Sequence, residues 1–357
     1  MVNGTGSFAG GDEIANSIVR KNINVRDNVD LTFNNVAGNH PNISGNGNIS
    51  INFDKQANTA GVYIDGNISA NNLTIKTIGT TKGISTEYGV YSITDKININ
   101  LNNNLTINSG CDSIFATESV DKDIIISAQG KVDLTSVSGR GIFNADLGTN
   151  NIIVSAKKGI SINSGTNANR NKFGGVLNFG NGKVELSSDA GTIYINSGDA
   201  HGVKTQNTSI TNLYSLGNFI IGEKNGVTQN GGELNIKATN SITNSVALFS
   251  DYYNKYNNVF IGETGSGFES SGSGTSKIIA GNNNVFGGLE NGILSTSSGT
   301  IYADAKNNIV GFDENDNIYN NEGELITDDF IGKNGIYVES GKVTLDADNE
   351  NRIKATE

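Results

Sequence analysis

The amino-acid sequence predicts an all-β protein, a parallel β-helix with three short strands in each coil and roughly ten coils. Three observations lead to this prediction. Apolar residues alternate with small polar ones, the period of a strand with one buried face, and no helical pattern accompanies them. Glycine makes up 46 of the 357 residues and proline one, as expected of a chain that turns every few residues and pairs nearly every backbone N–H. A short marker recurs along the chain, which indicates a solenoid.

Residues 89–110 show how one coil is built. They contain three apolar-alternating runs, at 90–93, 97–101 and 105–107, separated by Thr-Asp-Lys and by three asparagines. These linkers favour turns. Three strands of this size bury too little surface to be stable alone, so the unit is expected to stack on copies of itself.

The copies are marked by a small residue, an aliphatic residue, a bulky residue and a usually small one. The first five intervals between markers run from 24 to 34 residues and fit single coils, whereas the last three run from 43 to 45 and fit either a coil with an inserted loop or two coils with one degenerate marker. The markers are Gly61-Val62-Tyr63-Ile64, Gly89-Val90-Tyr91-Ser92, Ser113-Ile114-Phe115-Ala116, Gly141-Ile142-Phe143-Asn144, Gly175-Val176-Leu177-Asn178, Gly202-Val203-Lys204-Thr205, Ala247-Leu248-Phe249-Ser250, Gly292-Ile293-Leu294-Ser295 and Gly335-Ile336-Tyr337-Val338.

The marker also predicts which side chains face inward. Its second position is always aliphatic, so we expect it to stack in the core, whereas its third position admits Lys204 and is expected outside. We expect one elongated domain over residues 1–357, with less regular coils at 1–60, regular coils at 61–202 and coils with longer insertions at 203–357. The two ends should be bare sheet edges unless they are capped.

Charge and cysteine content narrow the class of protein. The formal net charge is −11, and no basic cluster exceeds the pair Lys157-Lys158, which argues against nucleic-acid binding and against attraction to anionic lipid. The single cysteine, Cys111, excludes an intrachain disulfide framework. No apolar run is long enough for a transmembrane helix, so direct membrane insertion is not expected.

The markers, the Asn-Gly turns and strands such as NISINF, NLTIKT and NLTINSG resemble the β-helical passenger repeats of Gram-negative type V autotransporter and filamentous-haemagglutinin-like adhesins, with the Asn/Lys/Ile-rich composition of fusobacterial outer-membrane adhesins. The resemblance covers nearly the whole chain and is one of repeat style. It implies a right-handed β-helix, secreted across the outer membrane and displayed at the bacterial cell surface. The signal peptide, translocator barrel and secretion domain of that family are not recognisable here, so we expect a segment of a longer protein. We also expect this segment to be a monomer.

Parallel β-helices also include pectin-degrading enzymes, but the catalytic pattern of that class is incomplete here. The chain has Ala200-His201-Gly202, Asp328-Asp329 and Arg352-Ile353-Lys354 but no Asn-Thr-Asp, and the histidine precedes the aspartate pair. His40 and His201 are the only histidines. Ser and Thr are therefore expected to lack a partner base, and two histidines offer few ligands for a His-based metal site. We therefore predict no catalytic residues.

Aromatic residues suggest two places for ligand binding. The outward column Tyr63, Tyr91, Phe115, Phe143 and Leu177 could hold a sugar ring or a partner protein, or it could be a stabilising ladder beneath a neighbouring turn. A second group, Tyr252, Tyr253 and Tyr256, lies among Asn and Ser in a long interval, as in a recognition loop or as in a coil with a degenerate marker.

One acidic segment has calcium-like spacing. Asp313, Asn315, Asn317 and Glu324 match positions 1, 3, 5 and 12 of an EF-hand loop, although Ile318 stands where that loop needs glycine. A solvated acidic insertion is the alternative interpretation, and no cofactor is otherwise expected. Asp346, Asp348 and Glu350 form a second acidic cluster with the same two interpretations.

The sequence thus predicts a non-enzymatic cell-surface adhesin segment that attaches to a protein or glycan on host cells or other bacteria. The alternative is a passive stalk that displays a distal adhesive tip, and a polysaccharide-degrading enzyme is the third interpretation. Exposed aromatic or loop patches would favour the adhesin, a uniformly polar surface the stalk, and a groove with clustered carboxylates the enzyme.

Overall fold

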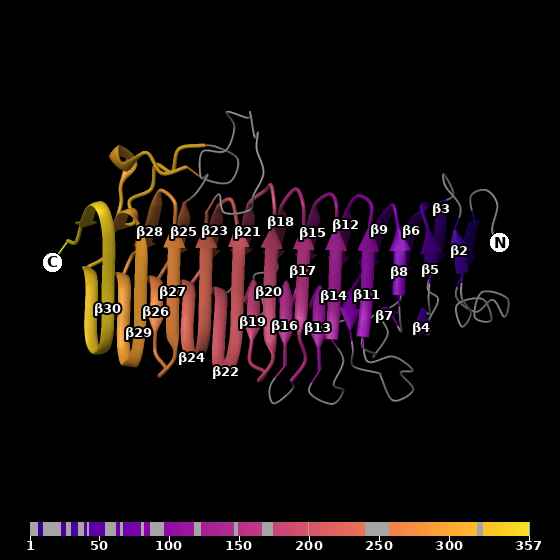
Figure 1. Ribbon diagram of the computed structural model, residues 1–357, viewed down its shortest axis with the longest axis horizontal. Helices are drawn as coiled ribbons and strands as arrows, with labels where there is room; N and C mark the ends of the chain where they lie inside the picture. The colour runs from indigo at the N-terminus through magenta and orange to yellow at the C-terminus, as the bar shows by residue number, and fades with distance from the viewer. Residues whose placement is uncertain are drawn as a thin grey trace.

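The computed structural model describes residues 6–9, 23–25, 30–34, 39–40, 43–53, 62–64, 67–79, 82–85, 96–117, 123–145, 149–165, 174–198, 200–239, 257–319 and 324–356. These residues form one elongated stack of parallel strands with the N- and C-terminal ends at opposite ends of the rod (Figure 1). Each turn of the chain visits three faces in the same order, which confirms the prediction of a parallel β-helix with three strands per coil.

The strands are best described by the face to which they belong. Face 1 contains β2 (Ile23–Val25), β5 (Ile43–Gly45), β8 (Asn67–Ala70), β11 (Lys96–Leu101), β14 (Asp123–Ala128), β17 (Ile152–Ala156), β20 (Lys183–Ser188) and β27 (Thr275–Ala280). Face 2 contains β1 (Gly6–Ala9), β3 (Asp30–Asn34), β6 (Asn48–Phe53), β9 (Asn72–Thr77), β12 (Leu105–Ser109), β15 (Val132–Ser136), β18 (Ile160–Ser164), β21 (Ile193–Ser197), β23 (Asn218–Gly222), β25 (Asn258–Gly262) and β28 (Asn283–Gly288).

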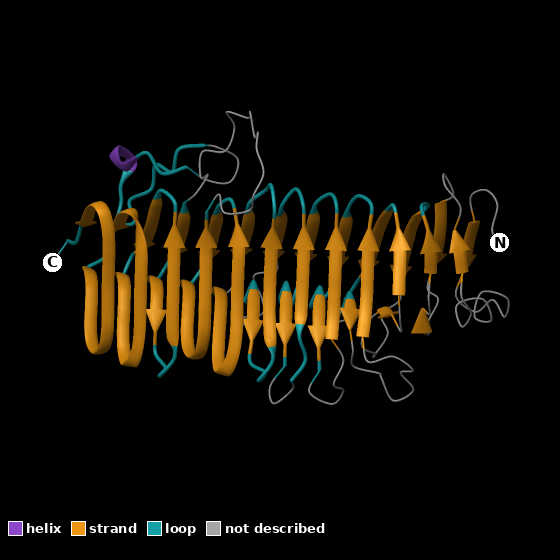
Figure 2. Cartoon of the chain, viewed as in Figure 1, coloured by secondary structure: helices purple, strands orange, loops and turns teal. Residues whose placement is uncertain are grey.

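Face 3 contains β4 (Asn39–His40), β7 (Val62–Ile64), β10 (Ile84–Ser85), β13 (Ile114–Ala116), β16 (Ile142–Asn144), β19 (Val176–Asn178) and β26 (Ser266–Ser270). Four long strands bend around corners and serve more than one face: β22 (His201–Ser215) and β24 (Asn225–Ala238) serve faces 3 and 1, and β29 (Asn291–Val310) and β30 (Asn334–Ile353) serve all three (Figure 2).

The described residues form thirteen rungs on face 2, where the following strands pair in series: β1, β3, β6, β9, β12, β15, β18, β21, β23, β25, β28, β29 and β30. The sequence predicted roughly ten coils. The difference arises because the strands within residues 1–60 pair regularly although they lack the marker, and because two markers further along were not recognised.

Aliphatic residues of successive rungs stack directly on one another in the core. One column of face 2 runs through Ile107, Leu134, Ile162 and Ile195, all of which are at most 1% exposed. The second marker position behaves as predicted, since Ile114, Ile142, Val176, Val203 and Ile293 are fully buried. Burial of these columns at each interface between rungs is the main stabilising term of the fold.

Three markers occupy positions other than those predicted. Ile84 pairs with both Val62 and Ile114, so Gly83-Ile84-Ser85 supplies the coil that was assigned to residues 89–92. Val227 pairs with Val203 and with Phe268, so Gly226-Val227-Thr228 and Gly267-Phe268-Glu269 supply the next two coils, and the assignment to residues 247–250 is wrong. The interval after residue 203 therefore holds an unrecognised coil, while the interval after residue 292 holds a coil and an insertion.

The glycine of the marker is explained by a close approach between coils. A Cβ atom added to Gly141 would lie well within 3.0 Å of the Ile162 Cγ2 methyl in the following coil, and Gly175 meets Ile195 in the same way. Ser113 takes the glycine position in one coil. The core residue that corresponds to Ile162 in this coil is Leu134, which has no methyl branch on Cβ. The first marker position and the facing core residue of the next coil thus form a matched pair.

This pairing predicts a coupled effect on stability. Gly141→Ala should lower the free energy of unfolding by about 1–3 kcal/mol because the new methyl overpacks against Ile162. Combining it with Ile162→Leu should recover part of that loss, giving a coupling energy of at least about 0.5 kcal/mol in urea titrations of the four chains. Ile160→Leu is the matched control on the same strand, and additive behaviour of both pairs would contradict the proposed contact.

A ladder of asparagines, all buried except the last, stabilises one corner of the later coils. The amide Nδ2 of each asparagine donates to the Oδ1 of the next at 2.8–3.0 Å, in the order Asn218, Asn258, Asn284, Asn308 and Asn351. Each Nδ2 of the first four also donates to a backbone carbonyl of a neighbouring coil. The ladder therefore satisfies polar groups at the corner that apolar columns could not.

A strap formed by residues 311–319 and 324–333 covers the outer side of face 2 near the C-terminal end (Figure 2). It carries the short 3-10 helix η2 (Glu314–Asp316). Phe312, Ile318 and Phe330 of the strap pack against outward residues of face 2, including Val285 and Ile309, in a second hydrophobic cluster separate from the main core. An insertion was predicted for this interval, but the sequence did not indicate that it folds back onto the β-helix.

No helix among the described residues has the length and apolar character needed to span a membrane.

Candidate functional site

The outer side of face 3 carries the column in which the sequence placed a ligand-binding surface. The third marker positions follow one another along the rod in strict register. In chain order they are Tyr63, Ser85, Phe115, Phe143, Leu177, Lys204, Thr228, Glu269, Leu294 and Tyr337. The column is thus aromatic and aliphatic in its first half and polar in its centre.

The aromatic half is covered. Phe115 is 8% exposed and Phe143 half-buried, and their ring centroids lie 5.3 Å apart. The Lys82 ammonium lies 3.9 Å from the Phe115 ring centroid, and the Arg140 guanidinium 3.7 Å from that of Phe143. These neighbouring, mutually tilted rings with cations over their faces match the stabilising ladder, one of the two interpretations of the column.

The structure does not describe the side chains of two members of the predicted aromatic column. The Tyr63 backbone lies in β7 at the predicted register, but its side chain lies outside the described part of the structure. Tyr91 lies outside the described residues, and Ser85 takes the column position predicted for it. The loop tyrosines Tyr252, Tyr253 and Tyr256 also lie outside the described residues.

A ladder role for the rings predicts a stability effect. Phe115→Ala should lower the free energy of unfolding by about 2–3 kcal/mol, because it removes a buried ring and leaves Phe143 and Lys82 without their contact. Urea unfolding followed by far-UV circular dichroism would measure this. An unchanged unfolding midpoint together with lost binding to cells would instead make the column a ligand surface.

The polar centre brings together five side chains from three successive rungs: His201 and Lys204 from β22, Asn225 and Thr228 from β24, and Glu269 from β26. The Thr228 hydroxyl lies 2.8 Å from the His201 Nδ1. The Asn225 side-chain amide donates to Thr228 Oγ1 at 3.2 Å and to the Glu269 carboxylate in a short hydrogen bond. We call these five residues the His201 cluster.

The hydrogen bonds determine the tautomer of the histidine. The Ser266 backbone N–H donates to Asn225 Oδ1 at 2.8 Å, which fixes that atom as the acceptor and leaves the Nδ2 group as a donor. The Asn225 Nδ2 donor also lies 3.4 Å from His201 Nδ1, so a proton on Nδ1 would face another donor, and Nδ1 instead accepts from the Thr228 hydroxyl. The imidazole proton therefore lies on Nε2.

Burial and charge keep this histidine neutral. Desolvation by burial, followed by the positive charges of Lys204 and Lys224, lowers the pKa of His201 to about 4. Burial also lowers the pKa of the Lys204 ammonium, which the nearby Glu269 carboxylate partly offsets. At neutral pH the cluster thus combines an uncharged imidazole, a cation and an anion.

The cluster corrects one expectation from the sequence, since Thr228 does have a histidine as its hydrogen-bond partner. The arrangement resembles a nucleophile and base in distance, but Thr228 is 3% exposed, so its hydroxyl is not accessible to a substrate carbonyl. Three polar groups in the cluster make no hydrogen bond to any residue that the structure describes: His201 Nε2–H, the Lys204 ammonium and Glu269 Oε1. The cluster is therefore suited to binding rather than to acyl transfer.

Sequence reasoning missed most of this cluster for a specific reason. Thr228 and Glu269 follow aliphatic or aromatic residues in the unrecognised markers Gly226-Val227 and Gly267-Phe268. Thr228 and Glu269 fall in the same column as Lys204 only when these two markers are included in the strand register. The signal was a glycine and an apolar residue followed by a polar one, as in Gly202-Val203-Lys204, but the aromatic or aliphatic third residue of most other markers drew attention away from it.

The predicted calcium loop is held by cations of the chain itself. Lys354 Nζ lies 2.9 Å from Asp313 Oδ2 and 2.8 Å from Asp316 Oδ2, and Arg352 lies 2.7 Å from Asp316 Oδ1. The hydrogen bond from Lys354 lowers the pKa of Asp313. The Asn315 N–H also bonds to Asp313, so these carboxylates anchor the strap to the last coil.

The other two predicted calcium ligands, Asn317 and Glu324, do not join Asp313 in a metal site. Asn317 adopts the left-handed conformation after η2 and donates to the Asn315 carbonyl, and Glu324 is exposed. No group of three or more His, Cys, Asp and Glu side chains in the described part of the chain is arranged to hold a metal ion.

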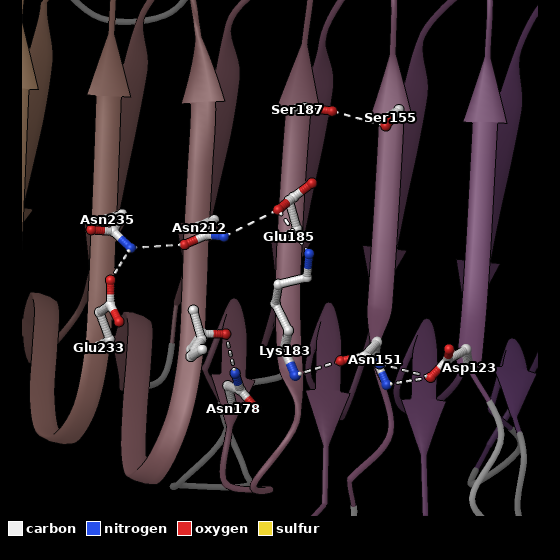
Figure 3. A network of polar contacts seen from close by, with 11 residues as sticks. Asp123, Asn151, Ser155, Asn178, Lys183, Glu185, Ser187, Asn212, Glu233 and Asn235 are labelled. Carbon is white, nitrogen blue, oxygen red and sulfur yellow. Dashed lines mark hydrogen bonds and ion pairs between the residues drawn. The ribbon is translucent and has the colours of Figure 1, made fainter.

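Face 1 carries a second polar surface, in which the side chains bond to one another across rungs (Figure 3). Glu185 Oε2 accepts from Lys183 Nζ and from Asn212 Nδ2, each at 3.1 Å, and Asn235 Nδ2 donates to Asn212 Oδ1 at 3.0 Å. The chain of bonds continues to Glu233 at one end and through Asn151 to Asp123 at the other. Because these polar groups bond to one another, we interpret them as stabilising contacts between neighbouring rungs and not as a ligand-binding site.

The described residues define the class of protein as a parallel β-helix with a polar cluster on one outer face. Comparison of the chain with protein-family models, curated proteins and solved structures found no match in any of the three.

Proposed function

We propose that this chain is a non-enzymatic segment of a bacterial cell-surface adhesin, secreted across the outer membrane and displayed as a rigid rod. Its partner would be a protein or glycan on a host cell or on another bacterium. The resemblance of the repeats to autotransporter passengers motivates the location, and the single supporting observation from the structure is the His201 cluster. On the outer side of face 3 it presents two donors and one acceptor that make no hydrogen bond to any residue in the described part of the chain.

A passive stalk is the second candidate, and a separate observation favours it. The Phe115 and Phe143 rings lie beneath cations, and the polar groups of face 1 are largely bonded to one another. Such a surface stabilises a long rod without engaging a partner. The two candidates agree on the location of the protein and differ in whether this segment binds.

The test is binding of the purified, folded chain to whole bacterial and host cells, with and without enzymatic removal of surface glycans and with and without calcium. Saturable binding that glycan removal abolishes would support an adhesin with a glycan receptor. Saturable binding that resists the treatment would support a protein receptor. A folded chain that binds none of these surfaces would favour the stalk.

A further inference from the structure

The unbonded groups of the His201 cluster define what can occupy it. His201 Nε2–H and the Lys204 ammonium can only donate hydrogen bonds, whereas Glu269 Oε1 can only accept one. Lys204 and Glu269 lie in one column on either side of Thr228, so the cation and the anion are two rungs apart. A ligand that satisfies all three groups must therefore both accept and donate over a short span.

This requirement distinguishes between classes of ligand. A simple anion would satisfy His201 and Lys204 but would meet the Glu269 carboxylate. A simple cation would satisfy Glu269 but would meet Lys204, beside which Lys224 adds a second positive charge. Adjacent hydroxyl groups on a neutral sugar accept from the imidazole and the ammonium and donate to the carboxylate, with no repulsion.

The cluster is also held in place before any ligand arrives. Asn225 fixes one oxygen of Glu269, and Thr228 fixes the imidazole orientation and its tautomer. Asn225 and Thr228 are themselves buried. The half-buried Phe179 ring, whose centroid lies 5.7 Å from Lys204 Nζ, adds an apolar surface beside the polar groups. A preorganised site of this kind loses little conformational entropy on binding.

We propose that His201, Lys204 and Glu269 form a binding subsite for neighbouring hydroxyl groups of a neutral sugar. This proposal rests on the proposed function, because it names the receptor class and the place on the rod where that receptor is bound. His201, Lys204 and Glu269 make the direct contacts, while Asn225 and Thr228 are positioning residues.

The test uses the full chain and a panel of neutral methyl glycosides of glucose, galactose, mannose and N-acetylglucosamine, with glucuronate and spermine as charged probes. Binding is followed by the Nε2–H resonance of His201 in a His40→Asn background, so that one histidine remains. The expected result is a saturable shift of this resonance with at least one neutral glycoside, and none with spermine. Glu269→Gln should weaken that glycoside about tenfold, because it replaces a charged acceptor by a neutral one.

Two controls keep the outcomes distinct. Glu290→Gln, at an exposed glutamate, should leave glycoside binding unchanged, and thermal unfolding verifies that each variant is folded. Glu269→Gln should also allow glucuronate to bind, because the repulsion between the two carboxylates is removed and the Lys204 ammonium remains to bind the anion. A shift with glucuronate in the unmodified chain and with no neutral glycoside would overturn the proposal in favour of an anion site.

Failure of the subsite and failure of the adhesin function give different results. If the chain binds cells and Glu269→Gln binds them equally, the subsite is wrong and the adhesin function stands. If the chain binds neither cells nor any neutral glycoside, both are wrong and the stalk is favoured. Loss of cell binding in Glu269→Gln, with Glu290→Gln unaffected, would support both.

Discussion

Ile142→Asp is expected to destroy cooperative folding of the central coils. Ile142 is fully buried and stacks between Ile114 and Val176, so an aspartate there would place an unpaired carboxylate between two aliphatic side chains. The expected loss in the free energy of unfolding is more than about 4 kcal/mol. Urea titration with far-UV circular dichroism would show either no cooperative transition or a much lower midpoint.

The matched control is Ile125→Asp, at an outward position of face 1. Ile125 is half-buried and is flanked in register by Asn98 and Ile153, so an aspartate there can reach water. We expect it to cost about 1 kcal/mol or less. Equal effects of the two substitutions would mean that the assignment of inner and outer columns is wrong.

The second large effect is a loss of stability in mild acid that depends on His201. Its pKa falls from 6.5 in the unfolded chain to about 4 in the folded one, so the unfolded state takes up a proton first as the pH is lowered. The free energy of unfolding should therefore fall by about 3 kcal/mol between pH 6.5 and pH 4 and change no further through this residue below that. The groups responsible are the buried surroundings, with Lys204 and Lys224 adding to the effect.

The contribution of His201 is isolated by comparison with His201→Gln, which keeps an acceptor for Thr228 and does not titrate. The pKa of Glu263 is raised by burial and by the charges of Glu223 and Asp328, so this residue contributes in the opposite sense in both chains. Unfolding free energies should converge between the two chains as the pH falls from 7 to 4. Parallel curves would show that His201 is not buried as described.

Much of the fold could be predicted from the sequence because each coil repeats a simple physical requirement. The alternation around Ile97 and Ile99 specifies a buried side, and the aliphatic second marker position specifies the core column. What could not be predicted was the register where the repeat varies. Val90-Tyr91 fits the marker as well as Ile84-Ser85 does, and only the pairing between coils decides that the latter is stacked.

The candidate site was less predictable for the same reason. The third marker position does lie outside the main core, but several of its side chains, including Phe115 and Thr228, are buried rather than at the surface. The cover over Phe115 comes from Lys82, which belongs to the preceding coil. The His201 cluster needs three coils in register before its members meet. The anchoring of the strap through Arg352 and Lys354 joins residues that are far apart in the sequence, and the acidic spacing alone suggested a different partner for Asp313.

The contact between Gly141 and Ile162 has a consequence for how such rods can lengthen or recombine. The two residues belong to neighbouring rungs, but both lie between the marker at Gly141 and the next marker at Gly175, so the interchangeable module runs from one marker to the next. A duplication or exchange that cuts within a pair would join a serine or alanine to an isoleucine that cannot accommodate it. Viable junctions should therefore be confined to cuts that carry both members together, or that meet leucine, as Ser113 does with Leu134.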